Sequence, residues 1–186
     1  MTEIWKIIDE FPNYLVSNLG KVKNIRNEQI MNEGFSDGYA RVHLTNSKGH
    51  KRPYVHKLVF FAFISDVLNN KSIDHINRNK TDNKAENLRL ANFSQQGLNK
   101  DKKTGCTSNF KGVSKHSNKW IAAISINKKP VYLGSFDFEN EAALMYNWFA
   151  IKLYKDFAVI NPNVKGFYTQ ELSQKIMKIL EKQKIK

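Results

Sequence analysis

A polar segment set between two short apolar pieces constrains this chain more than any other part of its sequence. Residues 74–86 form a turn-rich stretch of Asn, Asp and Lys, and strand-like pieces flank it at 72–75 and 87–90. Asn92 followed by Gln95 resembles a helix cap, so a helix is predicted to begin near Phe93. The order strand, loop, strand, helix would bring four polar side chains within reach of one another: Asp74, His75, Asn87 and Gln96.

Two of these side chains have the chemistry that hydrolysis of a phosphodiester requires. His75 offers a base whose ordinary pKa is about 6.5. Asp74 and an amide oxygen are hard ligands that suit Mg²⁺ or Mn²⁺, and such an ion would offset the charge of the transition state. An isolated Asp-His pair carries little information, so the interpretation depends on the pattern around it.

The charge of the chain favours a polyanionic partner. Its 30 Lys and Arg outnumber its 17 Asp and Glu, which gives a net charge of +13 and a pI near 9.7. A membrane surface is the alternative polyanion, but no run of about 18 apolar residues is present and the N-terminus lacks a signal pattern. We therefore expect double-stranded DNA as the partner, with no membrane and no small-molecule substrate.

Cysteine usage fits a reduced, intracellular setting. Cys106 is the single cysteine, so an intramolecular disulfide and a Cys-rich zinc cluster are both excluded. We interpret Cys106 as an inert residue of a small polar loop.

Hydrophobic periodicity divides the rest of the chain into further elements. Alternation broken by a Gly turn predicts a hairpin over 14–25, and alternation returns at 38–44. The period then changes to that of a helix over 54–64, with one apolar face: Val55, Leu58, Val59, Ala62 and Phe63.

The C-terminal half predicts a second compact unit. Strands are expected at 110–115, 119–127 and 130–136, followed by a helix at 139–154 that could cover the sheet. Thr169 can cap a final basic helix whose apolar stripe is Leu172, Ile176, Ile179 and Leu180.

Five blocks around the polar segment resemble the HNH homing endonucleases of phage introns. In order they are Val55-His56-Lys57-Leu58-Val59, Ile73-Asp74-His75-Ile76-Asn77, Lys80-Thr81-Asp82-Asn83, Glu86-Asn87-Leu88-Arg89 and Ser94-Gln95-Gln96. That family folds its site as two strands and a helix around one divalent metal ion. The resemblance implies that His75 is the general base, Asp74 a metal ligand and Asn87 the residue that orients the base and the loop. The last motif residue of the family, usually His or Asn, falls on Gln96, which keeps an amide oxygen on a longer side chain.

The other histidines are assigned no direct chemistry. His56 stands at the start of the predicted helix, where the family often has histidine, and we expect packing or hydrogen bonding from it rather than catalysis. His43, His50 and His116 lie in strand or loop contexts without metal-ligand spacing.

Residues 110–161 resemble a second family, the ethylene-response-factor type of DNA-binding domain. The matching residues include Phe110-Lys111-Gly112-Val113, Lys119-Trp120-Ile121-Ala122 and Tyr132-Leu133-Gly134-Ser135-Phe136. In that family the three-stranded sheet enters the major groove, which implies DNA contacts from one sheet face that bears Lys111, Lys115, Lys119 and Trp120. This chain has lysines where arginines usually read guanine, and Trp120 could instead be part of the core of a small α+β domain.

The N-terminal residues 3–25 look like the small module that precedes the HNH core in phage enzymes. Residues 1–50 carry no net charge, so we expect mainly packing from them, with Lys21, Lys23 and Arg26 available for phosphates. Near the predicted site, the cations expected to contact DNA are Arg78, Lys80 and Arg89.

The sequence thus predicts a small multi-domain α+β chain: a strand-strand-helix HNH metal nuclease core, then a three-stranded antiparallel sheet packed on one helix. Its parts are a module at 1–50, the nuclease core at 51–103, a linker at 104–109, the DNA-binding domain at 110–161 and a basic helix at 162–186. We expect a site-specific DNA endonuclease with one Mg²⁺ or Mn²⁺, active as a monomer or homodimer.

Two other functions and a cellular setting complete these expectations. The main rival is a non-catalytic, sequence-specific DNA-binding protein on an inherited nuclease scaffold, because Gln96 departs from the motif. An RNA-binding module is disfavoured, since the aromatic-rich sheet signature of common RNA modules is missing. The expected setting is the cytoplasm of a bacterial host, with a phage or intron as the source of the gene.

Overall fold

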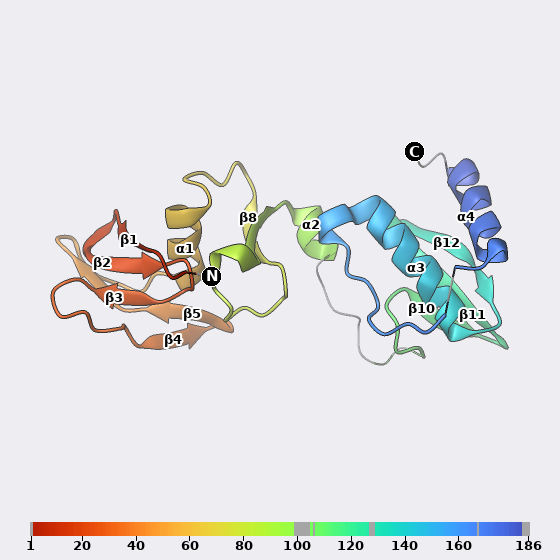
Figure 1. Cartoon of the computed structure of the whole chain (residues 1–186), viewed down its shortest axis with the longest axis horizontal. Coiled ribbons are helices and arrows are strands. Elements are labelled where there is room, and N and C mark those ends of the chain that lie inside the picture. Colours follow the sequence, from red (N-terminus) through yellow and green to blue (C-terminus); the bar gives the residue numbers. More distant parts are fainter. Residues whose placement is uncertain (1, 99–104, 106, 127–128, 167, 184–186) are drawn as a thin grey trace. The chain divides into compact units, whose positions relative to one another are not determined.

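The structure is a computed structural model that describes residues 2–98, 105, 107–126, 129–166 and 168–183. The chain is a mixture of short strands and helices, and it forms two compact units, Met1–Gln96 and Gly97–Lys186 (Figure 1). The linker predicted at 104–109 lies partly outside the described residues, as does Cys106. No helix within the described part of the chain is long and apolar enough to cross a membrane.

The first unit consists mainly of short antiparallel strand pairs. Its strands are β1 (Trp5–Ile8), β2 (Phe11–Ser17), β3 (Val22–Asn24), β4 (Glu33–Ser36), β5 (Tyr39–Val42), β6 (Leu44–Asn46), β7 (Gly49–Lys51), β8 (Ser72–His75) and β9 (Leu88–Ala91). β1, β2 and β3 form one sheet, while β4 pairs with β5, β6 with β7, and β8 with β9. Helix α1 (Val55–Phe63) lies within the predicted range, and a 3₁₀ turn at Ala85–Asn87 precedes β9.

One hydrophobic core joins the segments 1–50 and 51–96. Val55, Val59 and Phe60 of α1 are fully buried and pack in the same cluster as Phe11 and Val42 from the preceding strands. The boundary predicted near residue 50 is therefore not a boundary between compact units. Short strand pairs and a nine-residue helix each have one apolar face, and they bury it by packing on one another.

The strand β9 leads directly into α2 (Phe93–Leu98), and the cap predicted from the sequence is present. The backbone N–H of Gln95 donates to Oδ1 of Asn92, and the N–H of Asn92 donates to Oε1 of Gln95, both at 2.9 Å. This reciprocal pair satisfies two N–H groups that the first turn of a helix leaves without backbone partners. The pair fixes where α2 begins after the β8–β9 sheet.

The second unit is a three-stranded antiparallel sheet packed on one long helix. Its strands are β10 (Val113–His116), β11 (Lys119–Ile126) and β12 (Lys129–Phe136), with β11 in the middle. Helix α3 (Glu139–Tyr154) lies against the sheet (Figure 1) and is followed by a 3₁₀ turn at Lys155–Phe157. The core between them is apolar, with Ala122, Leu133 and Phe149 among its most deeply buried side chains.

The strand register separates residues that we expected on one sheet face. Trp120 lies opposite both Lys115 and Phe136, and Phe136 is buried in the core on the helix side of the sheet. Trp120 is partly buried against the same core. Lys119 pairs with His116, and because strand residues alternate, it points to the outer face. The structure thus corrects the expectation of a single face that bears Lys115, Lys119 and Trp120 together.

The final helix, α4 (Gln170–Gln183), begins at the predicted cap. The N–H of Leu172 donates to Oγ1 of Thr169 at 3.2 Å. Leu172 and Ile176 are buried in the core of the second unit, and Ile179 packs against it with part of its surface exposed. Most of the predicted stripe is therefore a packing face.

Candidate active site

His75 is the last residue of β8 and is almost completely buried. Its Nε2 lies within hydrogen-bond distance of Oδ1 of Asn83, at 3.2 Å, and its ring lies 5.4 Å from the ring of His56 and 5.9 Å from that of Tyr39. Burial lowers the pKa of His75 below its usual value, although the bond to Asn83 and the carboxylates of Asp74 and Asp82 act in the opposite direction. The side chain is therefore neutral at pH 7 and can accept a proton.

Asp74 precedes His75 on the same strand and forms an ion pair across the sheet. The register places it opposite Arg89, whose Nε donates to Oδ2 of Asp74 at 2.9 Å. Both side chains are about 85% buried, with 13% and 15% of their surface exposed. Arg89, expected to contact DNA, is thus engaged with the carboxylate expected to bind the metal ion.

Asn87 holds the polar loop in place, as a residue at the end of the 3₁₀ turn. Its Oδ1 accepts the backbone N–H of Asn77 at 2.9 Å, and its Nδ2 donates to the carbonyl oxygen of Asp82 at 2.7 Å and to Oδ1 of Asn77 at 3.0 Å. These bonds join the two ends of the loop. The hydrogen bond from His75 goes to Asn83, a buried residue that sequence reasoning did not assign to the site.

The two other cations expected near the site lie on the loop itself. Lys80 lies with its Nζ 4.5 Å from the ring centre of Tyr39 and donates to the carbonyl oxygen of Asp37 at 3.0 Å. Arg78 is exposed and has a backbone φ of 65°. Lys80 thus connects the polar loop to the β4–β5 hairpin, and the ring of Tyr39 lies close to both that lysine and His75.

Gln96 lies in α2, where its side chain is partly exposed and its backbone N–H donates to the carbonyl oxygen of Asn92. No group of three or more His, Cys, Asp or Glu side chains within the described residues is arranged to hold a metal ion. The donor set proposed from the sequence is of another kind, one carboxylate from Asp74 and one amide oxygen from Gln96. Both are hard oxygen donors, which fits a Mg²⁺ or Mn²⁺ ion that keeps several waters.

His56 has the packing role that the sequence indicated. Its ring lies between aromatic neighbours, stacked on Tyr54 at 5.4 Å and tilted against Tyr39 at 5.1 Å. Its Nδ1 is buried and has no hydrogen-bond partner among the described residues. Burial, with smaller contributions from His75 and Lys57, lowers the pKa of His56 to about 4, so the ring is neutral.

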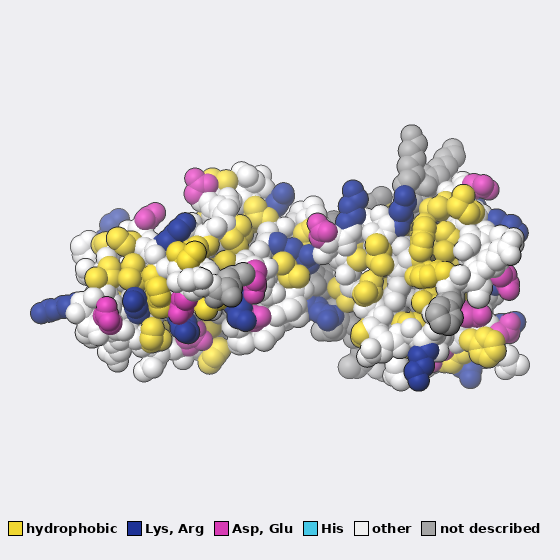
Figure 2. Space-filling view, in the orientation of Figure 1, with side chains coloured by type: hydrophobic (Ala, Val, Ile, Leu, Met, Phe, Trp, Pro, Cys, Tyr) yellow, Lys and Arg dark blue, Asp and Glu magenta, His cyan; other side chains and the backbone are white. Residues whose placement is uncertain are grey.

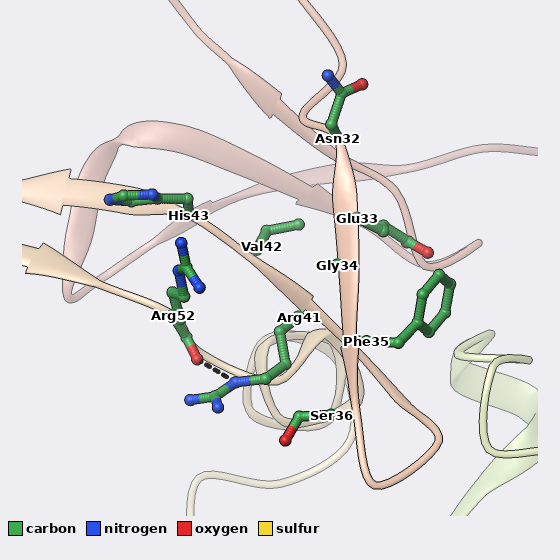
Figure 3. A pocket seen from close by; sticks show the side chains of 9 residues that line it. All are labelled: Asn32, Glu33, Gly34, Phe35, Ser36, Arg41, Val42, His43 and Arg52. Carbon is green, nitrogen blue, oxygen red and sulfur yellow. Dashed lines mark hydrogen bonds between the residues drawn. The ribbon is translucent and has the colours of Figure 1, made fainter.

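An open pocket on the β4–β5 hairpin adds two arginines that the sequence did not single out. Figure 3 shows Arg41, Arg52 and His43 on one side of β4, with Glu33 and Phe35 on the other. The Nε of Arg41 donates to the carbonyl oxygen of Arg52 at 2.7 Å, and its guanidinium lies 4.5 Å from the ring centre of Tyr54. The pocket thus presents two permanent cations on the unit that contains His75.

The cations predicted on the second unit occupy different surroundings. Nζ of Lys111 donates to the carbonyl oxygen of Leu98 at 2.8 Å, before the first strand of the sheet. Nζ of Lys115 lies 5.5 Å from the ring centre of Trp120. Lys119, on the outer face, pairs with Asp137 through two exposed side chains. Figure 2 shows Lys and Arg side chains spread over the visible face of both units rather than gathered in one patch.

Comparison with known protein families identifies the first unit. Residues 3–45 match the model of the NUMOD4 motif, and residues 53–98 match the model of the HNH endonuclease family. The second match includes every residue proposed for the reaction, from Asp74 to Gln96. The chain therefore carries an HNH endonuclease domain that follows a NUMOD4 motif.

Three relatives are uncharacterized HNH endonucleases of Acanthamoeba polyphaga mimivirus. The first is 38% identical over 99 residues, which are 50% of this chain and 25% of the relative. The second is 30% identical over 144 residues, which are 77% of this chain and 41% of the relative. The third is 33% identical over 109 residues, which are 58% of this chain and 56% of the relative. The chain thus spans between a quarter and just over half of their lengths. A solved structure of DNA binding and cleavage by the HNH homing endonuclease I-HmuI is similar at 31% identity and a TM-score of 0.48, with 52% of this chain and 56% of that chain covered.

Proposed function

We propose that this chain, which carries an HNH endonuclease domain, is a DNA endonuclease that uses His75 as general base and one divalent metal ion. The observation that carries the proposal is a buried histidine beside Asp74 at the end of β8, inside the segment that matches the family model. The loop that follows is fixed at both ends by Asn87. Such preorganisation is what a reacting group needs.

The role of His75 in the reaction is to remove a proton from the attacking water. A neutral imidazole accepts this proton at pH 7, and burial favours the neutral form. Asp74 and Gln96 would hold the metal ion, which would offset the charge that develops on the phosphate. The Arg89 guanidinium holds Oδ2 of Asp74 and so fixes the orientation of that carboxylate.

The proposed substrate is double-stranded DNA, selected by sequence as in a homing endonuclease. The net charge of +13 supports a polyanion, and Arg41 and Arg52 supply two cations on the unit that contains His75. The outer sheet face of the second unit, with Lys119, His116 and the exposed Tyr132, is the surface we propose for reading the site. A monomer would nick one strand, whereas a homodimer would cut both.

Cleavage assays with supercoiled plasmid and long linear DNA test this function. We expect nicking or cutting in Mg²⁺ or Mn²⁺, none in excess chelator, and none by Asp74→Ala in Mg²⁺. Cleavage by the parent protein in excess chelator would contradict the single-metal mechanism. Tight binding to one sequence without cleavage in any divalent metal would favour the rival, a non-catalytic DNA-binding protein.

A further inference from the structure

The hydrogen bond between His75 and Asn83 defines one proton position on the imidazole. The amide oxygen of Asn83 faces Nε2 of His75 at 3.2 Å, and its amide nitrogen donates to the carbonyl oxygen of Thr81 at 3.3 Å. The carbonyl oxygen of Thr81 can only accept, so the Asn83 atom that faces it must be the amide nitrogen. The amide oxygen of Asn83 is then the atom that faces His75. An amide oxygen can only accept, so Nε2 of His75 carries the proton.

Asn83 is in turn held by a turn of the N-terminal motif. A Cβ atom at Gly20 would lie 3.0 Å from Cβ of Asn83 and 3.1 Å from its carbonyl carbon, so the glycine allows the turn to approach this closely. Gly20 has a φ of +88°, a conformation that favours glycine. Two residues further along the loop, the N–H of Ala85 donates to the carbonyl oxygen of Asn18 at 2.8 Å.

The turn itself is rigidly bonded. Ser17 is fully buried, and its Oγ accepts the N–H of Lys21 at 3.1 Å. Asn18 is also buried, and its side chain accepts the N–H of Ile4 at 2.8 Å and donates to the carbonyl oxygen of Thr2 at 3.2 Å. The turn is therefore a fixed surface against which Asn83 is placed.

We infer that Asn83 is a positioning residue that selects the Nε2–H tautomer of His75, and that the turn Ser17–Gly20 holds Asn83 in place for this purpose. In that tautomer the lone pair that takes the proton from water is on Nδ1. The inference rests on the proposed function, because it assigns a role within the same reaction. It also gives the N-terminal motif a part in the chemistry, through contact with the loop that holds the base.

The tautomer can be read directly by NMR with protein labelled with ¹⁵N at histidine. We expect the His75 ring of the parent protein to show the Nε2–H tautomer at pH 8, and Asn83→Leu to show a mixture or the Nδ1–H form. An Nδ1–H tautomer in the parent protein would overturn the inference without recourse to any variant. This measurement requires no cleavage, so it separates a failure of the inference from a failure of the proposed function.

Kinetics provide the second readout. Asn83→Leu should lower the single-turnover cleavage rate at saturating DNA by about 10- to 100-fold, the range for residues that orient a reacting group through one hydrogen bond, with DNA affinity unchanged. Asn83→Asp, which keeps an acceptor oxygen, should restore the Nε2–H tautomer and most of the rate at pH 9. A parental rate in a folded Asn83→Leu protein would overturn the inference.

The turn is tested with two glycines of the same unit. Gly20→Ala adds a Cβ that meets Asn83, whereas Gly49→Ala adds one at a φ of +110° with no atom within 4 Å. We expect both variants to lose stability, but only Gly20→Ala to lose the uniform His75 tautomer and at least about 10-fold in rate. Equal rates for the two folded variants would exclude the turn from positioning the base.

Discussion

The two units of this chain differ in where their buried polar side chains gather. Among the described residues, those of the first unit are Ser17, Asn18, His56, His75, Asn83 and Asn87, and those of the second are Ser108, Asn147 and Asn161. In the first unit His56, Asn83 and Asn87 lie at His75 or on the loop beside it, while the side chains of Ser17 and Asn18 bond to nearby backbone. In the second unit Asn147 and Asn161 join two separate segments: Asn161 exchanges two hydrogen bonds with the backbone of Lys111 and two with the side chain of Asn147, while Ser108 donates to Oε1 of Glu139.

This difference accords with the proposed division of the chain into a reaction unit and a recognition unit. Burial of polar groups costs free energy unless they are hydrogen-bonded, and Nδ1 of His56, beside His75, is buried without a hydrogen-bond partner among the described residues. In the second unit Asn147 and Asn161 fasten the segment that follows α3 to that helix and to the backbone of Lys111, just before β10. Substitutions of reacting side chains in the first unit should therefore change the cleavage rate. Substitutions that alter packing or surface charge in the second unit should change stability and DNA affinity.

The largest expected effect follows from removal of the base. His75→Ala should lower the cleavage rate by about two to four orders of magnitude, the range for general acid–base catalysis, while DNA affinity stays nearly constant. Single-turnover rates at saturating DNA, with binding measured separately, provide the test. His50→Ala is the control, since His50 is an exposed histidine of the same unit that bonds to Thr45. Parental cleavage by His75→Ala would end the assignment of the first unit as the reaction centre.

A side chain added at Gly112 should destabilise the second unit by overpacking its core. A Cβ there would lie 2.0 Å from Cδ2 of Tyr146 and 2.7 Å from the carbonyl oxygen of Ala123, at a φ of +73°. Gly112→Ala should lower the free energy of unfolding of this unit by about 3–5 kcal/mol, because overpacking and backbone strain add. Gly105→Ala, with a φ of +79° and no atom within 4 Å, isolates the strain and should cost about 1 kcal/mol.

The loss of unfolding free energy in each variant can be measured by tryptophan fluorescence in a Trp5→Phe background. The remaining tryptophans, Trp120 and Trp148, both lie in the second unit, so the signal reports on that unit. DNA affinity should fall in Gly112→Ala, whereas the cleavage rate at saturating DNA should be retained. A variant that binds DNA as the parent does would contradict a recognition role for the second unit.

Local signals in the sequence predicted the elements better than their packing. The cap at Asn92 and Gln95, the cap at Thr169 and the helix near 54–64 depend on residues close in sequence, and the structure contains all three. The sheet faces depend on register. The pairs Ala122–Gly134 and Ala123–Tyr132 skip Leu133, so a bulge shifts the alternation of β12 in a way that composition does not reveal.

The contacts around the candidate site divide in the same way, into those between residues close in sequence and those that depend on packing. Asp74, His75 and Asn87 lie in one short segment, and the β8–β9 register places His75 opposite Leu88, the residue after Asn87. The contact of Asn83 with His75 could have been suspected, because Asn83 lies in one of the motif blocks. Its support from Gly20 could not, since no periodic pattern specifies which turn packs against which loop. The Asp74–Arg89 pair likewise required the register, and the sequence had placed Arg89 on DNA.

Acid should affect the two units differently, because only the first buries histidine among the described residues. The pKa of His56 is lowered to about 4 in the folded state and is about 6.5 when unfolded, so the unfolded chain binds the proton first as the pH falls. Stability is therefore lost between pH 6.5 and 4, by about 1–2 kcal/mol from pH 7 to pH 5. His75 acts in the same direction.

Hydrogen exchange read by mass spectrometry, with each unit followed separately, checks this difference. Protection in the first unit should fall from pH 7 to pH 5 after correction for the intrinsic exchange rate, and His56→Phe should remove most of the fall. If the second unit loses as much protection as the first, the buried histidines are not the cause of the loss at low pH.

The smallest effect concerns surface charge on the outer face of the sheet. Lys119 pairs with Asp137, but both side chains are exposed, so the pair contributes little and a DNA phosphate can replace the carboxylate. Lys119→Ala should reduce the slope of log affinity against log salt by about one and weaken binding to all sequences alike. Lys152→Ala removes the same charge from the last turn of α3 and should leave the slope unchanged.

Lys115→Ala tests the other face of the sheet. The Lys115 amine lies over Trp120 on the helix side, so we expect this variant to leave the slope unchanged. If Lys115→Ala and Lys152→Ala lower the slope as much as Lys119→Ala does, DNA is not held by the outer face, and the charge of the unit acts only as a diffuse field.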